Sequence, residues 1–265
     1  MSPSPLPYAG AMALLNVRYY SSVLGLSTTA TVILPQAASG QIGMAGAAAG
    51  GRLPTLYLLH GLTDDDSIWQ RRTSIERYVA ELPLAVVMPT VHRGWYTDQA
   101  DGYRYFTHIA DELPQVMGSF FPLSQRREDT YAAGLSMGGY GAFKLALRRP
   151  ERFGAAASLS GALDVGAEPG DLGDDWRRTF STVERSRENG DDLIDLVHAA
   201  DPTATPRLWA WCGTEDFLLP HNHRFRDAAA DAGVGMEYHE SPGTHEWGAW
   251  DREIQRVLAW LPLSR

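Results

Sequence analysis

From Leu53 onward, short apolar runs alternate with segments that have the residue pattern of amphipathic helices. The apolar runs are TLYLLHG, LAVVMPT, TYAAGL, GAAASLSG, RLWAWCG and VGMEYHE. The helical patterns cover residues 67–81, 103–120, 138–149, 221–231 and 246–260. Buried strands that alternate with helices are typical of a mostly parallel sheet with helices on both faces, so we expect an α/β fold of this kind.

Three stretches depart from this alternation. The N-terminal runs LLNVRYYSS and STTATVILP are rich in β-branched and aromatic residues and predict two further strands. The Gly- and Ala-rich segment at residues 37–50 is expected to be a flexible connection. Residues 164–206 are acidic and rich in turn residues, which predicts a lid-like insertion over one end of the sheet. No repeat or second domain is visible, so residues 1–265 are expected to form one domain.

Charge and composition exclude some classes of partner. The formal net charge is -9, and an acidic surface disfavours binding to nucleic acid or to an anionic membrane surface. Cys212 is the single cysteine, so no internal disulfide can form, and its apolar surroundings predict a buried, inert thiol. The N-terminus has no basic region followed by a long apolar run, so we expect a cytoplasmic protein without a signal peptide or membrane span. A homo-oligomer is compatible with the sequence.

Residues 134–138, Gly-Leu-Ser-Met-Gly, match the pattern G-x-S-x-G. The match alone is weak, but here it lies between a buried strand and an amphipathic helix, which is the setting of a nucleophile elbow. Such a turn is so tight that a Cβ atom at either flanking position would clash, which explains Gly134 and Gly138. The pattern therefore predicts that Ser136 is an exposed nucleophile.

A serine nucleophile needs a base and an acid that orients the base. In this architecture the acid and then the histidine follow the serine, each just past a strand. His245 follows the run VGMEYHE in a loop and is the expected base, whereas His239 lies inside an apparent strand. Glu215 and Asp216 both follow the run RLWAWCG, and we choose Asp216 as the acid although both fit by position.

Two backbone N–H groups are needed to hold the oxyanion of the tetrahedral intermediate. The residue after the nucleophile, Met137, is expected to supply one, and Leu62, in the loop after TLYLLHG, the other. The acidic run at residues 64–66 lacks the spacing of a calcium loop, and His221 and His223 lack partners for zinc. We therefore expect no metal and no cofactor.

Aromatic side chains are frequent near the expected site, although most large aromatic residues in proteins belong to the core. Trp95 and Tyr96 follow the run LAVVMPT, which is expected to end at the same sheet edge as Ser136. Together with Trp247, next to the candidate base, they are expected to line an acyl or aryl pocket.

The motifs YLLHGLTDDDSIW, AGLSMGGYGAFKLAL, CGTEDFLL and GTHEWGAWD resemble the esterase D-like α/β-hydrolases. This family includes tributyrin esterases, S-formylglutathione hydrolases and feruloyl and acetylxylan esterases, and the likeness runs from about Asn16 to the C-terminus. It is closest to the intracellular tributyrin-esterase branch. The resemblance implies an α/β-hydrolase fold and a serine esterase triad on Ser136, Asp216 and His245. S-formylglutathione hydrolases usually carry a cysteine soon after the oxyanion turn, where this chain has acidic residues.

The expected function is hydrolysis of carboxylic esters with short or medium acyl chains, with a small-molecule ester as the substrate. A feruloyl or acetylxylan esterase is an alternative that the aromatic residues favour. Acyl transfer to an alcohol is a further alternative, but it needs a site that excludes water. A catalytically inactive binding module on the same scaffold belongs to a different class, and fluorophosphonate labelling distinguishes it from an enzyme.

Overall fold

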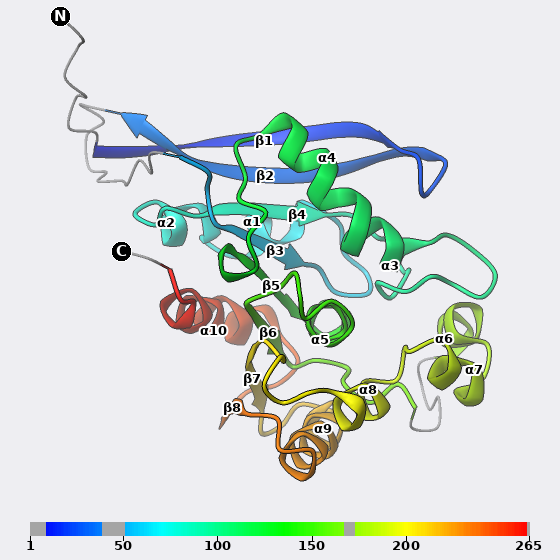
Figure 1. Cartoon of the computed structure of the whole chain (residues 1–265). Helices are drawn as coiled ribbons and strands as arrows, with labels where there is room; N and C mark the ends of the chain where they lie inside the picture. Colours follow the sequence, from blue (N-terminus) through cyan, green and yellow to red (C-terminus); the bar gives the residue numbers. More distant parts are fainter. Residues whose placement is uncertain (1–8, 39–50, 167–172, 264–265) are drawn as a thin grey trace, which may run out of the picture.

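The computed structural model describes residues 9–38, 51–166 and 173–263, which form one central sheet with helices on both faces (Figure 1). The strand order is β1-β2-β4-β3-β5-β6-β7-β8. The strands are β1 (Ala9–Ser21), β2 (Leu26–Ala38), β3 (Thr55–Leu59), β4 (Ala85–Pro89), β5 (Thr130–Leu135), β6 (Ala155–Leu159), β7 (Arg207–Gly213) and β8 (Met236–Ser241). Strands β4, β3, β5, β6, β7 and β8 are parallel to one another, so the predicted mostly parallel sheet is confirmed.

The two N-terminal strands form a long antiparallel hairpin at one end of the sheet. Its tight turn places Gly25 at a φ of 70°, a conformation that suits glycine. The hairpin joins the sheet through β2, which runs antiparallel to β4 over residues 30–33. Of the expected connection at 37–50, residues 39–50 lie outside the described residues.

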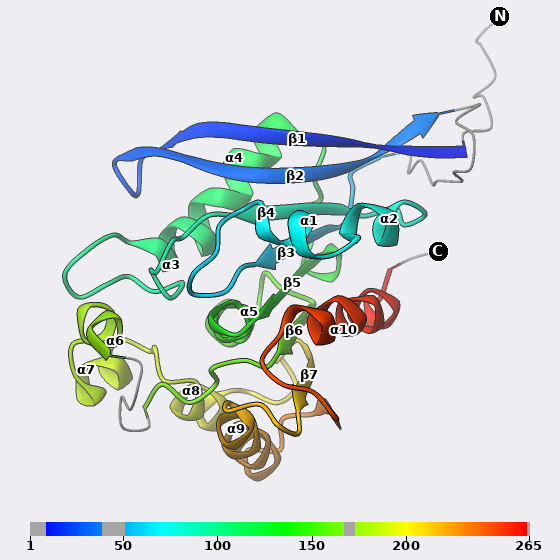
Figure 2. The same cartoon turned by 180° about the vertical axis from the view of Figure 1, so that it is seen from behind.

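Each strand of the sheet centre is buried on both sides, because helices cover both faces (Figures 1 and 2). Along β3, Leu56 and Leu58 join the apolar cluster under α1, α2 and α10, while Tyr57 and Leu59 join the cluster under α3, α4, α5, α8 and α9. The helices are α1 (Ile68–Arg72), α2 (Ile75–Val79), α3 (Tyr105–Thr107), α4 (Leu113–Phe120), α5 (Met137–Arg148), α6 (Gly173–Phe180), α7 (Val183–Glu188), α8 (Leu193–Ala199), α9 (Leu219–Asp231) and α10 (Trp247–Trp260).

Two expected helices are interrupted. The segment 67–81 forms α1 and α2 with a break at Thr73, whose backbone is extended. The segment 103–120 is helical from Tyr105, but a π-helical turn at His108–Glu112 separates α3 from α4. Pro114 lies in the first turn of α4, where the missing N–H of proline costs no helical hydrogen bond.

The segment 164–206 is partly built into the core. Its last helix, α8, packs against α5 and α9 and buries Leu193 and Val197. Before α8, Asp191 forms an ion pair with the fully buried Lys144 of α5, with 2.5 Å between Nζ and Oδ1. Residues 167–172 lie outside the described residues. Among the helices that the structure describes, none is long and apolar enough to cross a membrane.

Candidate active site

Ser136 stands in the sharp turn between β5 and α5. Its φ and ψ of 54° and -120° are strained for a residue with a side chain. The backbone is held there because Ser136 N–H donates to the Leu159 carbonyl, at 3.0 Å, and its own carbonyl accepts from Ala162 N–H, at 3.2 Å. Backbone strain that is fixed by neighbouring strands is typical of a nucleophile elbow.

Both flanking glycines are required by close backbone contacts. A Cβ atom on Gly134 would lie 2.4 Å from the carbonyl carbon of Gly138, and one on Gly138 would lie 2.5 Å from the carbonyl oxygen of Leu59. Real Cβ atoms do not approach other atoms so closely. The predicted reason for these two glycines is therefore confirmed.

His245 and Asp216 lie at the ends of neighbouring strands, β8 and β7 respectively. His245 Nδ1 lies 2.9 Å from Asp216 Oδ2 and 3.1 Å from Oδ1. Glu215, the alternative acid, instead accepts a hydrogen bond from Gly243 N–H at 2.7 Å and is exposed. The carboxyl ends of parallel strands meet at one edge of the sheet, which is why three distant segments converge on this region.

The Asp216 carboxylate is buried but well satisfied. Burial raises the pKa of this carboxyl, but the hydrogen bond and charge of His245, together with hydrogen bonds from Leu218 N–H and the Ser160 hydroxyl, lower it below its ordinary value. Asp216 is therefore ionised at neutral pH, and it can hold the imidazole with Nδ1 protonated. Nε2 is then left free to accept a proton.

Ser160 was not singled out by the sequence. It follows β6, is fully buried and has a φ of 48°. Its hydroxyl accepts the indole N–H of Trp250 at 3.2 Å, and it lies close enough to the Asp216 carboxyl to lower its pKa. The Trp250 ring also meets the His245 ring edge to face, with 4.8 Å between centroids. Ser160 and Trp250 thus hold the acid and the histidine in one network.

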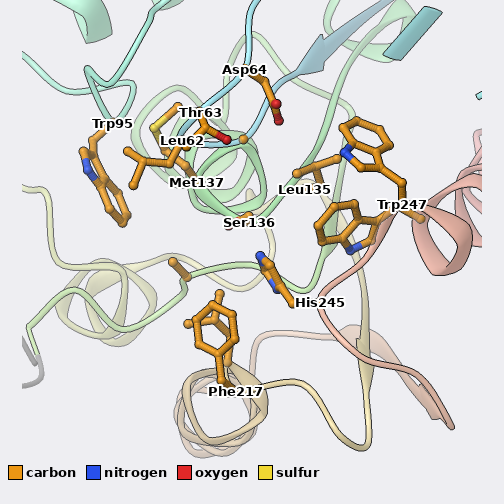
Figure 3. Close-up of a pocket in the computed structure, with 14 residues that line it drawn as sticks. Leu62, Thr63, Asp64, Trp95, Leu135, Ser136, Met137, Phe217, His245 and Trp247 are labelled. Atoms are coloured by element: carbon orange, nitrogen blue, oxygen red, sulfur yellow. The ribbon is translucent and has the colours of Figure 1, made fainter. Parts of the chain in front are cut away.

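A cavity of about 370 Å³ joins these groups. It is lined by Gly61, Leu62, Thr63, Asp64, Trp95, Leu135, Ser136, Met137, Ala162, Phe217, Leu218, His245, Trp247 and Trp250. Figure 3 shows the His245 imidazole directed toward Ser136 across this cavity. The cavity wall is mainly apolar, and its polar groups gather around one hydroxyl, as in sites that bind small molecules.

The two candidate oxyanion donors lie in the same cavity. Met137 is the first residue of α5, and Leu62 follows β3. Among the residues that the structure describes, no backbone carbonyl accepts the N–H of either residue. The arrangement therefore offers two free N–H groups beside Ser136, one of them at a helix N-terminus.

A family model described as "Putative esterase" matches residues 21–261. The chain belongs to this esterase family. Its sheet order and elbow agree with that membership, and the esterase is a carboxylic ester hydrolase of the α/β-hydrolase fold.

Three relatives show how far the similarity extends. The esterase is 28% identical to the acetyl esterase of Caldicellulosiruptor saccharolyticus over 94% of this chain and 98% of the relative. The substrate-bound structure of FphF, a fluorophosphonate-binding serine hydrolase of Staphylococcus aureus, is 33% identical, with a TM-score of 0.81 over 96% of this chain and 98% of that one. The S-formylglutathione hydrolase FrmB of the same organism is 32% identical, with a TM-score of 0.81 over 95% and 99%.

The loop that carries Leu62, the candidate oxyanion donor of the esterase, is held by a buried histidine. His60 Nδ1 lies 2.6 Å from the Gly61 carbonyl oxygen, and Nε2 accepts Val91 N–H at 3.0 Å. Burial lowers the pKa of His60 to about 4, so the ring is neutral and donates to Gly61 while accepting from Val91. His60 thereby fixes the loop that carries Leu62.

The prediction that Tyr96 lines the pocket is wrong. Its ring is fully buried and is absent from the cavity wall, and its hydroxyl donates to the His60 carbonyl at 3.1 Å. Through this hydrogen bond Tyr96 stabilises the loop that carries Leu62. Trp95 and Trp247 do line the cavity of the esterase, and Figure 3 shows them on opposite sides of Ser136.

The predicted lid does not contribute to the cavity wall. No described residue of 164–206 lines the cavity, although Phe180 packs edge to face on Trp95, with 5.7 Å between centroids. The reason is that α8 is held against α5 and α9 by its own apolar side chains. The described part of the segment therefore flanks the site.

The structure adds wall residues that the sequence analysis did not name, among them Asp64 and Phe217. Phe217 directly follows Asp216, is 67% exposed and has its ring 4.6 Å from that of His245. Its position directly after the candidate acid is the one sequence feature that could have predicted its place in the cavity wall. It stands at the mouth of the cavity, where it can contact whatever enters.

The acidic run at residues 64–66 does not converge on one point. Asp65 accepts hydrogen bonds from Ser67, whereas Asp66 accepts from Thr29, Thr31 and Thr90. Within the described residues, no group of three or more His, Cys, Asp or Glu side chains is arranged to hold a metal ion.

Proposed function

We propose that this esterase hydrolyses carboxylic esters with short or medium acyl chains through a Ser136–His245–Asp216 triad. The observation that carries the proposal is the paired contact of His245 Nδ1 with both oxygens of Asp216 in the cavity that exposes Ser136. A neutral imidazole held this way has one nitrogen left for the serine proton.

In the proposed reaction, His245 Nε2 takes the proton of Ser136 as Oγ attacks the ester carbonyl carbon. The carbonyl oxygen becomes an oxyanion that accepts hydrogen bonds from Leu62 N–H and Met137 N–H. His245 then gives its proton to the leaving alcohol, and the acyl group remains on Ser136. Water, deprotonated by His245, attacks the acyl-enzyme, and the acid leaves as Ser136 is protonated again.

The size and wall of the cavity support the acyl range. A volume of about 370 Å³ is at the small end for pockets that bind small molecules. Its wall carries Leu62, Leu135, Ala162 and Leu218, which suit an alkyl chain. We expect p-nitrophenyl acetate and butyrate to be turned over well, and long-chain esters poorly.

The test is the variant Ser136→Ala with p-nitrophenyl butyrate. Losing the nucleophile is expected to lower kcat by roughly 10,000-fold or more, because the triad acts as a unit. A fluorophosphonate probe is expected to label the wild-type protein and not the variant. Ser119→Ala, at an exposed serine of α4, is the matched control and keeps both turnover and labelling.

The same experiment also tests the alternative that the protein is a binding module without catalytic activity. Folded wild-type protein that neither reacts with the probe nor hydrolyses any ester of the series would reject the esterase mechanism. Near-wild-type turnover by Ser136→Ala would reject Ser136 as the nucleophile while leaving hydrolysis in place.

An aryl ester is a second candidate substrate, because four aromatic side chains line the cavity: Trp95, Phe217, Trp247 and Trp250. Aromatic walls favour a planar ring through edge-to-face or offset stacking. Methyl ferulate compared with tributyrin separates the two. A kcat/KM for methyl ferulate far below that for tributyrin rejects the feruloyl version.

A further inference from the structure

Asp64 brings a negative charge into an otherwise mainly apolar cavity. It lies on the oxyanion loop, two residues after Leu62, and is partly buried. Among the described residues that line this cavity, Asp64 is the one carboxylate, and neither Lys nor Arg is present. The proposed proton transfers use Ser136, His245 and Asp216, and Asp216 lies behind the cavity wall. Asp64 has no role in these transfers.

The Asp64 carboxylate forms no close ion pair in the described part of the chain. No Lys, Arg or His nitrogen there lies within 4.0 Å of it, whereas Asp65 and Asp66 are bound to hydroxyl groups of the protein. Burial raises the pKa of Asp64, and a hydrogen bond from the Gly61 backbone opposes this effect in part. Arg71 and Arg72 act on this carboxylate only from beyond ion-pair distance, so Asp64 still gains from a cation that enters the cavity next to it.

The charge lies close to the nucleophile. A Cβ atom placed on Gly61 would be 3.0 Å from Asp64 Oδ2 and 3.9 Å from Ser136 Cβ. The carboxylate oxygen and the nucleophile Cβ are therefore at most about 7 Å apart, the sum of these two distances. At this range a charge on the substrate, a few bonds from the reacting carbonyl, can pair with Asp64. An anionic substrate group at the same position would be repelled.

An indole lies on the same wall. Trp247 lines the cavity and is held by edge-to-face contacts with Trp69 and Trp250, with centroids 5.3 and 5.2 Å away. Figure 3 shows Asp64 between Leu62 and Trp247, above Ser136. A cavity lined by both a carboxylate and an indole is suited to an ammonium group, because aromatic rings attract cations and the carboxylate supplies the opposite charge. The formal net charge of -9 also attracts cations toward the protein.

We propose that Asp64 is a specificity residue that selects esters carrying a positively charged group, such as an ammonium, and disfavours anionic esters. This inference rests on the proposed serine esterase function. It assigns the Asp64–Trp247 side of the cavity to the charged part of the substrate and leaves the Trp95 side for an uncharged part.

Two esters of nearly equal shape test the proposal. Acetylcholine and 3,3-dimethylbutyl acetate differ in a quaternary nitrogen that replaces a carbon atom, so the ratio of their kcat/KM values reports the charge alone. We expect the wild-type ratio to favour acetylcholine by about tenfold, the range of a cation next to a carboxylate and an aromatic face. Asp64→Asn keeps the side-chain shape and is expected to reduce the ratio to near one.

Asp65→Asn is the matched control. It removes the same charge from the neighbouring residue, whose side chain is exposed and does not line the cavity. It is expected to keep the wild-type ratio. An anionic substrate, p-nitrophenyl hemisuccinate compared with p-nitrophenyl butyrate, is expected to gain in relative kcat/KM in Asp64→Asn. The acetylcholine preference is also expected to shrink with added salt.

The outcomes separate the two proposals. A wild-type ratio near one, with 3,3-dimethylbutyl acetate hydrolysed normally, overturns the role of Asp64 and leaves the esterase mechanism standing. An equal loss of the ratio in Asp64→Asn and Asp65→Asn overturns it as well, since general surface charge would then be the cause. Hydrolysis of neutral esters that persists in Ser136→Ala would overturn the proposed Ser136 mechanism, whatever the result for Asp64.

Discussion

At the scale of single residues, the proposed triad has beside it a serine that takes no part in the proposed proton transfers. Ser160 accepts a hydrogen bond from Trp250 and lowers the pKa of the Asp216 carboxyl, and it does so from a strained φ of 48°. A strained backbone at a buried position persists only where surrounding contacts hold it. The hydroxyl therefore aligns the carboxylate that in turn aligns His245, which makes Ser160 a positioning residue.

Ser160→Ala is expected to lower kcat for p-nitrophenyl butyrate by about tenfold to a hundredfold, the range of one hydrogen bond to a charged group. KM is expected to change little, because Ser160 is absent from the cavity wall. Steady-state kinetics with a Tm measurement checks this. Ser158→Ala is the control, since the buried Ser158 hydroxyl has no hydrogen-bond partner in the described part of the chain. Equal kinetics for the two variants would contradict the positioning role.

At the scale of elements, the elbow works because β3, β5 and α5 approach to backbone contact. Gly138, in the first turn of α5, faces the carbonyl groups of Leu59 and His60 at the end of β3. The same approach brings Met137 N–H near the oxyanion loop. The geometry of the candidate oxyanion site therefore depends on how closely α5 packs against β3.

Gly138→Ala is expected to push α5 away from β3, because its Cβ would lie 2.5 Å from the Leu59 carbonyl oxygen. The expected cost in unfolding free energy is about 2–4 kcal/mol, with a loss of activity of at least about a hundredfold. Urea unfolding and ester turnover measure both. Gly235→Ala, where an added Cβ meets no atom within 4 Å, is expected to keep activity and stability. A fully active Gly138→Ala protein would show that the close approach is dispensable.

At the scale of the whole molecule, two buried histidines, His60 and His108, and the partly buried His221 connect stability to pH. Burial lowers the pKa values of His60, His108 and His221, so each favours the neutral form in the folded state. The unfolded chain then binds protons at a higher pH than the folded chain does. Stability from these groups is complete above the ordinary histidine pKa and is lost as the pH falls toward the folded-state value.

For His60 the pKa falls from 6.5 to about 4, so its contribution of about 3 kcal/mol is lost as the pH falls from about 6.5 to about 4. Urea unfolding at pH 7.5 and at pH 4 measures the loss. His60→Gln cannot titrate, so its loss between the two pH values is expected to be smaller than that of the wild type by about this amount. His108 and His221 are present in both proteins and cancel. Equal losses in the two proteins would contradict the assignment.

Features that depend on local rules could be predicted from the amino-acid order. Alternating apolar runs and helical patterns predicted the mostly parallel sheet, because a strand buried on both faces must be apolar throughout. The elbow at residues 134–138 was predictable because the sterics of one turn require glycine at two positions. The candidates Ser136, Asp216 and His245 were chosen because, in this architecture, the serine, the acid and the histidine follow one another along the chain, each just past a strand.

The roles of residues adjacent in the sequence could be distinguished only in the folded protein. Glu215 and Asp216 lie in the same loop, but Glu215 bonds to Gly243 and Asp216 to His245. Both partners lie more than twenty residues further along the chain. Tyr96 and Trp95 are adjacent, yet Tyr96 turns into the core to reach His60 and Trp95 faces the cavity. Burial and hydrogen bonding of a side chain depend on groups brought together by folding, and no local pattern records them.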